Sequence, residues 1–367
     1  MSCLPQPGDS VVCDELVHNS VVMGCRLGRQ KETLSFRHND VDSLDEALRS
    51  VRGGKGNVRG NGKGSGRGEA AVSSSSNSDS KGKNNIFVAV ESVYSMDGDL
   101  APLGEILRVA DAHGALVIVD EAHATGVFGE SGRGLVSALG LEGHPSLLAG
   151  MHSFGKAFGA HGAVVVGSAT LKEFLVNYAR PLIYSTSLSL DSLACIKCAY
   201  LMQAGADDRR RRVLELADTF QSLLTEEERS VRDGDGGGAT PPLEAKDVPR
   251  NRSPIQCVLL SGNDRSSFVA ASLRSCGFDV RAIRKPTVAE GTERLRITLH
   301  AYNTDAEVES LARHIRRLAA ETKGNEMEGT TRSIRDKSPQ HGQLGKFGDG
   351  MARGFATMVE PGTRARL

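Results

Sequence analysis

The sequence predicts an α/β protein in which a mainly parallel sheet is joined to a smaller α+β domain. Short apolar runs at residues 86–90, 116–119 and 163–167 have the length of strands and lack the polar alternation of a half-exposed sheet. Helical spacing of apolar residues follows at 103–113 and at 171–178. Continuous apolar strands that alternate with helices are typical of a parallel sheet covered on both faces.

The pattern changes at about residue 190. A helical stretch at 190–204 continues as a charged helix to about residue 228. Further strands and helices are expected at 255–260, 265–276, 279–282, 294–299 and 304–319. This order is of the α+β type and predicts a second domain. We therefore expect a large domain at residues 1–187 and a small C-terminal domain at 188–322.

Two insertions and a tail are expected to be flexible. Residues 53–85 consist almost wholly of Gly, Ser, Asn, Lys and Arg, which offer nothing to bury. Residues 229–252 are rich in Gly, Pro and charge, and residues 323–367 are polar and Gly-rich. The basic part of the first insertion could suggest RNA contact, but it lacks the aromatic side chains on which bases stack. A solvated loop is the favoured interpretation.

Charge and composition restrict the kinds of partner that this protein is expected to have. Lys plus Arg and Asp plus Glu balance at 45 each, so the net charge favours neither nucleic acid nor an anionic membrane surface. No apolar run approaches the ~20 residues of a membrane span. The seven cysteines fit a reducing compartment, and Cys195 and Cys198 lack the second pair of a zinc site. We expect these two to be buried thiols in a helix, and we expect no metal.

The sequence ends in Ala365-Arg366-Leu367. This has the small–basic–Leu shape of the peroxisomal address whose type form is Ser-Lys-Leu. A peroxisomal location is therefore expected, with a chance tripeptide on a cytoplasmic protein as the alternative.

Asp120 opens the first of two motifs that carry chemistry. It follows an apolar run, so we expect it at the carboxyl end of a strand, where open α/β sheets bind ligands. A carboxylate there can hold a pyridinium nitrogen protonated, which makes the ring an electron sink. His123 lies three residues further on. The competing interpretation is an aspartate that caps the next turn beside a hydrogen-bonded histidine.

Lys156 is the centre of the second motif, Ser-Phe-Gly-Lys-Ala-Phe-Gly at residues 153–159. Glycines on either side of a lysine allow a backbone or a ligand to approach closely. A lysine beside a bound cofactor can act as a Schiff-base nucleophile. Taken by itself the motif is weak, because most lysines are solvated surface groups.

Together the two motifs resemble the signature of fold-type I, class II pyridoxal-phosphate-dependent enzymes. The likeness covers most of residues 8–51 and 86–322, and its clearest segments are 14–20, 37–40, 93–103, 132–134, 183–187 and 282–288. These segments are similar to the α-oxoamine synthases. That family includes the 8-amino-7-oxononanoate, 5-aminolevulinate and 2-amino-3-ketobutyrate enzymes and serine palmitoyltransferase.

The resemblance implies a role for each matching residue around pyridoxal 5′-phosphate. Lys156 would form the Schiff base and later move the proton of the substrate Cα. Asp120 would pair with the pyridine nitrogen, and His123 would hydrogen-bond the phenolic oxygen of the ring. His18, in the setting Leu-x-His-x-Ser, matches the histidine that stacks on the ring.

Four further residues match supporting positions of the family. Ser153 would bind the phosphate, and Ser95 would line the edge of the ring. Thr186 matches a hydroxyl that reaches across the dimer interface to the phosphate of the other subunit. Arg284 matches the arginine that grips the amino-acid carboxylate, a task that suits a bidentate guanidinium. The resemblance therefore implies a homodimer with shared active sites.

The implied reaction condenses an amino acid with an acyl-CoA and releases CoA and carbon dioxide. The segments at 153–159, 183–187 and 282–288 favour the biotin-pathway branch, the 8-amino-7-oxononanoate synthases, which join L-alanine to pimeloyl-CoA. The alternatives within the family are the 5-aminolevulinate and 2-amino-3-ketobutyrate types.

Members of the family carry a longer N-terminal portion than precedes His18 in this sequence. We therefore expect an N-terminally incomplete member, with strands missing from the sheet and an apolar edge exposed. An alternative from another class is a non-catalytic homologue that dimerises with a complete partner. The presence of Lys156, Asp120, His123 and His18 argues against it.

Overall fold

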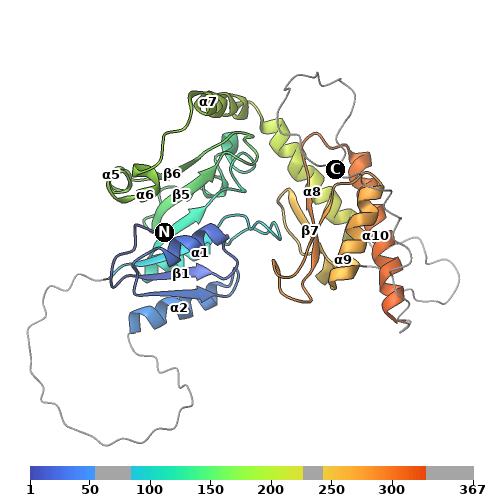
Figure 1. Ribbon diagram of the computed structural model, residues 1–367, viewed down its shortest axis with the longest axis horizontal. Coiled ribbons are helices and arrows are strands. Elements are labelled where there is room, and N and C mark those ends of the chain that lie inside the picture. Colours follow the sequence, from blue (N-terminus) through green and yellow to red (C-terminus); the bar gives the residue numbers. More distant parts are fainter. Residues whose placement is uncertain (54–83, 226–242, 328–367) are drawn as a thin grey trace, which may run out of the picture. The chain divides into compact units, whose positions relative to one another are not determined.

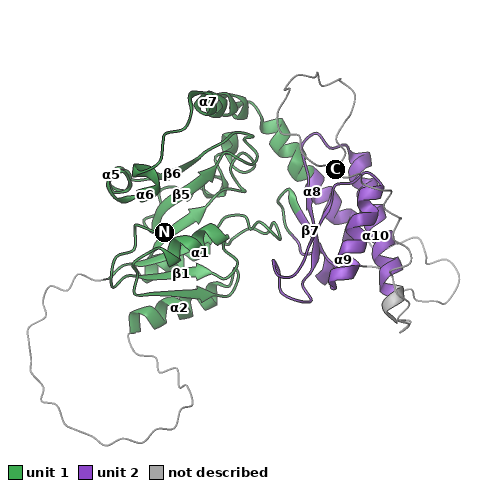
Figure 2. Cartoon of the chain, viewed as in Figure 1, with its two compact units in different colours: residues 1–215, 251–255 green, residues 216–250, 256–367 purple. Residues whose placement is uncertain are grey.

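The protein is described by a computed structural model that covers residues 1–53, 84–225 and 243–327. These residues fall into two compact units (Figure 2). The first unit contains the described residues of 1–215 with 251–255, and the second contains the described residues of 216–250 and from 256 onward. The units divide within helix α8 (Asp207–Thr225), whereas the domain boundary expected after residue 187 stays a prediction.

A six-stranded sheet forms the frame of the first unit (Figure 1). Its strands are β1 (Ser10–Asp14), β2 (Glu32–Phe36), β3 (Ile86–Glu91), β4 (Leu116–Asp120), β5 (Leu147–Ser153) and β6 (Ala163–Gly167). Their order across the sheet is β2–β1–β3–β4–β5–β6. The pairings from β2 to β5 are parallel, and β6 runs antiparallel to β5. The mainly parallel sheet expected from the sequence is confirmed.

Helices connect and flank the strands of this unit. They are α1 (Asn19–Arg26), α2 (Val41–Gly53), α3 (Leu103–Ala112), α4 (Leu135–Ala138), α5 (Ala169–Tyr178), α6 (Arg180–Ile183), α7 (Leu190–Ala204) and the short η1 (Glu130–Gly132). In α3, Leu103, Ile106 and Leu107 recur at helical spacing and are completely buried. Gly114 follows with φ +58°, the left-handed conformation that commonly ends a helix.

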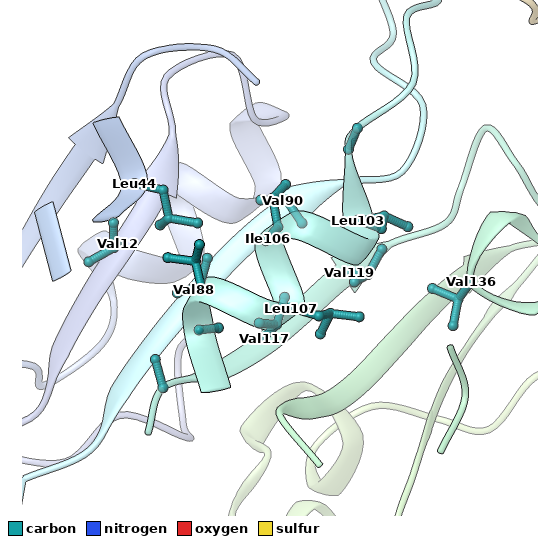
Figure 3. Close-up of a cluster of buried hydrophobic side chains, with 14 of the residues drawn as sticks. Val12, Leu44, Val88, Val90, Leu103, Ile106, Leu107, Val117, Val119 and Val136 are labelled. Atoms are coloured by element: carbon teal, nitrogen blue, oxygen red, sulfur yellow. The ribbon is translucent and has the colours of Figure 1, made fainter. Parts of the chain in front are cut away.

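Alternate side chains of the central strands bury the two faces of the sheet. The larger cluster, shown in Figure 3, includes Val12, Leu44, Val88, Val90, Leu103, Ile106, Leu107, Val117, Val119 and Val136. On the other face, Val11, Cys13 and Phe87 pack with Cys25 of α1. Helices therefore cover both faces, as a parallel sheet requires.

The edge strand β6 differs from the buried strand expected at residues 163–167. All of its residues are exposed, and Val164, Val165 and Val166 have exposed fractions of 37%, 50% and 53%. Among the described strands, β6 has a neighbour on one side, β5, and this leaves its apolar side chains uncovered.

Cys195 and Cys198 lie on α7 and are exposed, so the expectation of buried thiols is wrong. This helix packs on the rest of its unit through Ile196 and Ala199. Most of its other residues are exposed, the two cysteines among them.

The second unit has the α+β composition expected of the C-terminal part. It contains the end of α8, β7 (Ile255–Leu259), α9 (Asn263–Ser275), β8 (Arg281–Ile283), β9 (Arg294–Thr298), α10 (Asp305–Met327) and the short η2 (Ala245–Asp247). The strand order is β7–β9–β8, and β8 and β9 are antiparallel. Leu216, Phe220, Leu273, Leu295 and Ile315 are completely buried in this unit.

Several expectations fall on parts of the chain that the structure leaves undescribed. Most of the insertion expected at 53–85 and most of that at 229–252 lie outside the described residues, as does the tail beyond Met327 with its Ala365-Arg366-Leu367 ending. Helix α10 continues past the boundary expected at residue 322. None of the described helices has the length and apolar character that a membrane crossing would need.

Replacing Leu107 with alanine tests the packing of α3 on the sheet. The side chain is completely buried, so the free energy of unfolding is expected to fall by about 2–5 kcal/mol through lost contacts and the remaining cavity. Urea unfolding followed by circular dichroism measures the change. Leu27→Ala is the matched control, because Leu27 is 70% exposed. Equal losses in the two variants would contradict the placement of α3.

Candidate active site

Three neighbouring strands end in buried carboxylates. Asp14 ends β1, Glu91 ends β3 and Asp120 ends β4. Their exposed fractions are 1%, 3% and 9%. Glu91 and Asp120 are direct register partners. Carboxylates buried this close to one another can ionise together when cations or N–H donors reach them. The surrounding loops supply such groups.

Asp120 is the carboxylate at the centre of this edge. Its Oδ1 accepts a hydrogen bond of 2.9 Å from the backbone N–H of Ala122. Burial raises the pKa of Asp120, while the charges of Lys156 and His18 lower it. Lys156 and His18 therefore lie within electrostatic range of Asp120.

Packing on both sides holds the loop that carries Lys156. Phe154 and Phe158 are buried, and their rings lie 5.6 and 4.9 Å from the ring of Tyr200 on α7. The backbone N–H of Phe154 donates to the carbonyl of Gly162 at 2.9 Å. Lys156 itself is exposed. The loop is therefore anchored by its two aromatic residues while its lysine stays accessible.

Gly126 lets the loop that follows Asp120 lie against the loop of Lys156. Its φ is +83°, which side chains rarely adopt. A Cβ at this position would lie 3.0 Å from the Cβ of Ala157 and 3.1 Å from the Cδ2 of Phe158. Close approach of the two loops therefore requires glycine here.

His18 stands on the loop that leaves β1. It is exposed, and it caps α1 through its Nδ1, which accepts from the backbone N–H of Ser20 at 3.2 Å. The backbone N–H of His18 donates to the carboxylate of Glu91. A buried strand-end carboxylate thus fixes the position of the histidine's backbone.

A cavity of about 280 Å³ has Asp120 in its wall, whereas Lys156 and His18 are not among its lining residues. Its lining includes Asp120, Val90, Met151 and Ser20. Its volume is close to the lower end of ordinary small-molecule sites. A buried carboxylate in the wall of an otherwise mainly apolar cavity suits a ligand with one cationic or hydrogen-donating ring atom.

The other predicted residues are each described by their own surroundings. Ser95 and His123 are half-buried on the loops that follow β3 and β4. Ser153 ends β5, and its Oγ accepts from the backbone N–H of Gly155 at 3.3 Å. Thr186 is exposed between α6 and α7. Arg284 belongs to the second unit, where it donates to the Oγ of Ser267 at 2.8 Å. Their roles stay predictions.

Glu91 and His152 are site residues that the sequence reasoning missed. Burial and the charge of Asp120 raise the pKa of Glu91 to about 7. The signal for Glu91 is the one that found Asp120, a carboxylate directly after a buried strand. His152 has no such signal. Its Nδ1 lies 2.9 Å from the Oγ1 of Thr125, and burial lowers its pKa, which favours the neutral ring.

Comparison with known proteins defines the class. Residues 1–315 match the family model described as Aminotransferase class I and II. The 8-amino-7-oxononanoate synthases of Emericella nidulans and Anaeromyxobacter dehalogenans are each 36% identical to the chain, over 84% and 82% of its length. The chain spans 68% and 63% of those two proteins.

A solved structure has the same fold. It is a serine palmitoyltransferase from S. paucimobilis with a bound PLP–myriocin aldimine. It is 27% identical, has a TM-score of 0.67, and matches 88% of this chain and 69% of its own. The fold is therefore that of the fold-type I pyridoxal-phosphate-dependent transferases. The chain belongs to the class I and II aminotransferase family, and its relatives place it with the α-oxoamine synthases.

Among the described residues, no group of three or more His, Cys, Asp and Glu side chains could hold a metal ion.

Replacing Glu91 with glutamine tests the crowding of carboxylates at the sheet edge. The pKa of Glu91 is raised from 4.5 to about 7. Its contribution to folding is therefore fully present below pH 4.5 and lost as the pH rises to about 7, a change on the order of 3 kcal/mol. Glutamine keeps an oxygen that can accept from the backbone N–H of His18. Because it does not ionise, the variant does not lose stability over this pH range.

The measurement is the free energy of unfolding of each protein at a series of pH values in urea. Relative to the parent, Glu91→Gln is expected to gain stability across that pH window. Glu105→Gln is the control, because Glu105 is exposed on α3. A Glu91→Gln curve parallel to that of the parent would show that Glu91 ionises without cost.

Proposed function

We propose that this protein acts as a pyridoxal-phosphate-dependent α-oxoamine synthase, which condenses an amino acid with an acyl-CoA and releases carbon dioxide. The observation that carries the proposal is the grouping of buried Asp120 with Lys156 and His18 at the carboxyl edge of a parallel sheet. Open α/β sheets bind ligands at this edge.

Pyridoxal 5′-phosphate is the cofactor indicated by the family and by the relative that holds it. The residues present fit this group. Asp120 is buried, and one of its oxygens is engaged by a backbone N–H, so it suits a protonated ring nitrogen. Lys156 is accessible on an anchored loop, and His18 is exposed for stacking. When bound, the ring supplies an electron sink for a carbanion at the substrate Cα.

The chain's own residues prepare the site for that chemistry. Asp120 holds a proton on the ring nitrogen, because a buried carboxylate is stabilised by a cationic neighbour. Lys156 takes the proton from the substrate Cα and later returns one, as a positioned general base. His123 orients the phenolic oxygen of the ring, and Ser153 and Ser95 hold the phosphate and the ring edge.

Arg284 is proposed to bind the amino-acid carboxylate. A guanidinium binds a carboxylate through two parallel hydrogen bonds, and the side chain is exposed at the end of β8. Binding the carboxylate would orient the substrate Cα for the bond cleavage that the cofactor supports.

L-alanine and pimeloyl-CoA are the proposed substrates, in a step of biotin synthesis. Support comes from the two relatives named 8-amino-7-oxononanoate synthase, at 36% identity. The alternative is another α-oxoamine synthase activity of the 5-aminolevulinate or 2-amino-3-ketobutyrate type. The serine palmitoyltransferase at 27% identity keeps this alternative open.

A second copy of the chain is the proposed partner. Exposed large apolar side chains of the first unit concentrate in β6 and α5 to α7, where they include Val165, Val176, Tyr184, Leu190 and Leu201. Apolar surface of this kind marks a protein interface. Thr186 lies in the same part of the chain, as expected of a residue that reaches the partner's phosphate.

Chemical trapping tests the role of Lys156. Pyridoxal phosphate is added to the protein and the product is reduced with borohydride, which fixes a phosphopyridoxyl group on the lysine that binds the aldehyde. Peptide mass spectrometry is expected to find the group on Lys156 in the parent and not in Lys156→Ala. Lys172→Ala, which removes another exposed lysine, should label as the parent does. Labelling spread over many lysines would refute a specific site.

Substrate preference tests the proposed branch. CoA release is measured with L-alanine plus pimeloyl-CoA and with glycine plus acetyl-CoA or succinyl-CoA. The alanine pair is expected to be turned over faster, because the relatives at 36% identity are named for that reaction. Faster release with glycine would sink the assignment to this branch. Labelling at Lys156 without CoA release from any pair would instead favour the non-catalytic partner subunit.

A further inference from the structure

His38 bridges two carboxylates on different segments of the first unit. It lies between β2 and α2, and its side chain is 21% exposed. Its Nδ1 is 2.9 Å from the Oδ1 of Asp14, and its Nε2 is 2.7 Å from the Oδ2 of Asp99. Ionised carboxylates only accept hydrogen bonds, so both ring nitrogens must donate. The bridge therefore consists of an imidazolium between two carboxylates.

Backbone contacts extend this bridge to three segments. The Oδ2 of Asp14 accepts from the backbone N–H of Asn39 at 2.8 Å, and its Oδ1 accepts from that of Leu16 at 2.8 Å. Asn39 has φ +53°, a conformation that asparagine tolerates better than most residues. Its side-chain amide also donates to Asp99, at 2.6 Å. The ends of β1 and β2 and the loop after β3 are thus joined at one point.

Two of the joined segments carry candidate cofactor contacts. His18 follows Asp14 on the loop that leaves β1. Ser95 lies in a closed turn, in which the backbone N–H of Tyr94 donates to the carbonyl of Asp99 at 3.0 Å. Asp99 is therefore part of the turn that presents Ser95, and Asp14 begins the loop that presents His18.

We propose that His38 is a positioning residue, whose bridge between Asp14 and Asp99 holds the His18 loop and the Ser95 turn in register around the cofactor ring. The inference rests on the proposed function, since His18 and Ser95 are assigned to the ring through it. His38 touches neither substrate nor cofactor and acts through these two segments.

The charges around His38 favour the bridged form at neutral pH. Burial lowers the pKa of His38, but the hydrogen bonds to Asp14 and Asp99 outweigh it and raise the pKa to about 9. Glu15 faces the same residue, because its carboxylate accepts the backbone N–H of His38 at 2.9 Å. The ring of Tyr94 packs edge to face at 4.4 Å. On the loop of His38 itself, Arg37 and Asp40 pair with each other.

A matched histidine elsewhere in the unit separates positioning from general stabilisation. The Nε2 of His113 lies 2.7 Å from the Oδ1 of Asp45, and its side chain is 17% exposed. This pair joins α2 to the end of α3, away from the segments that carry His18 and Ser95. His113→Gln therefore removes a similar ion pair without loosening the proposed bridge.

The first readout is hydrogen–deuterium exchange of the full chain without added cofactor. In His38→Gln, exchange is expected to rise at residues 15–18 and 93–99, while other segments follow the parent. In His113→Gln, those two segments should exchange as in the parent. If His38→Gln does not fold, Asp99→Asn takes its place, because Asp99 is 25% exposed and its loss leaves Asp14 paired with His38. Unchanged exchange at both segments would overturn the proposal.

The second readout is the affinity for pyridoxal phosphate, measured with the induced circular dichroism of the bound ring. His38→Gln is expected to weaken binding about tenfold or more, because misplaced contacts around a ring cost affinity steeply. His113→Gln should bind as the parent does, and equal losses in both variants would overturn the positioning role. A parent that binds no pyridoxal phosphate would refute the proposed function, whereas the exchange experiment would still decide the bridge.

Discussion

Burial of three neighbouring carboxylates is the constraint on which the candidate site depends. Asp14, Glu91 and Asp120 end adjacent parallel strands, and the exposed fraction of each is below 10%. Such groups are costly unless each has a donor or a cation. His38 and two backbone N–H groups satisfy Asp14, and the N–H of His18 reaches Glu91. Because these carboxylates require donors and cations, the loops that supply those groups are held in place at the edge of the sheet.

The same constraint explains why the site can bind a cationic ring. Burial raises the pKa of Asp120, and the charges of Lys156 and His18 oppose that rise. Both of these residues are exposed on loops, so they are accessible to a ligand that binds beside the carboxylate. Phe154 and Phe158 hold the lysine's loop, and Gly126 lets the loop after Asp120 lie against it. The packing of these uncharged residues therefore fixes the positions of the loops that carry Lys156 and follow Asp120.

Sequence reasoning found the parts of this arrangement that leave a local signal. The apolar runs of β3 and β4 predict buried strands, and Asp120 and Lys156 stand in motifs of the family. The strands β1 and β2 were missed, because the apolar run of β1 is only three residues long and polar residues stand between the apolar ones of β2. Glu91 follows a buried strand as Asp120 does, but it lies outside the segments that resemble the family most clearly. Whether β6 and Cys195 are exposed depends on which other segments pack against them. The local sequence pattern does not contain that information.

Calorimetry with 4-deoxypyridoxine 5′-phosphate tests the central claim most directly. This analogue lacks the aldehyde, so its binding reports on the ring nitrogen without any bond to Lys156. Binding enthalpies in mildly alkaline buffers of different ionisation enthalpy give the protons taken up. The account predicts net uptake of protons by the parent complex and its loss, together with weaker binding, in Asp120→Asn, because buried Asp120 requires a cationic ring. The same proton uptake in both proteins would contradict it.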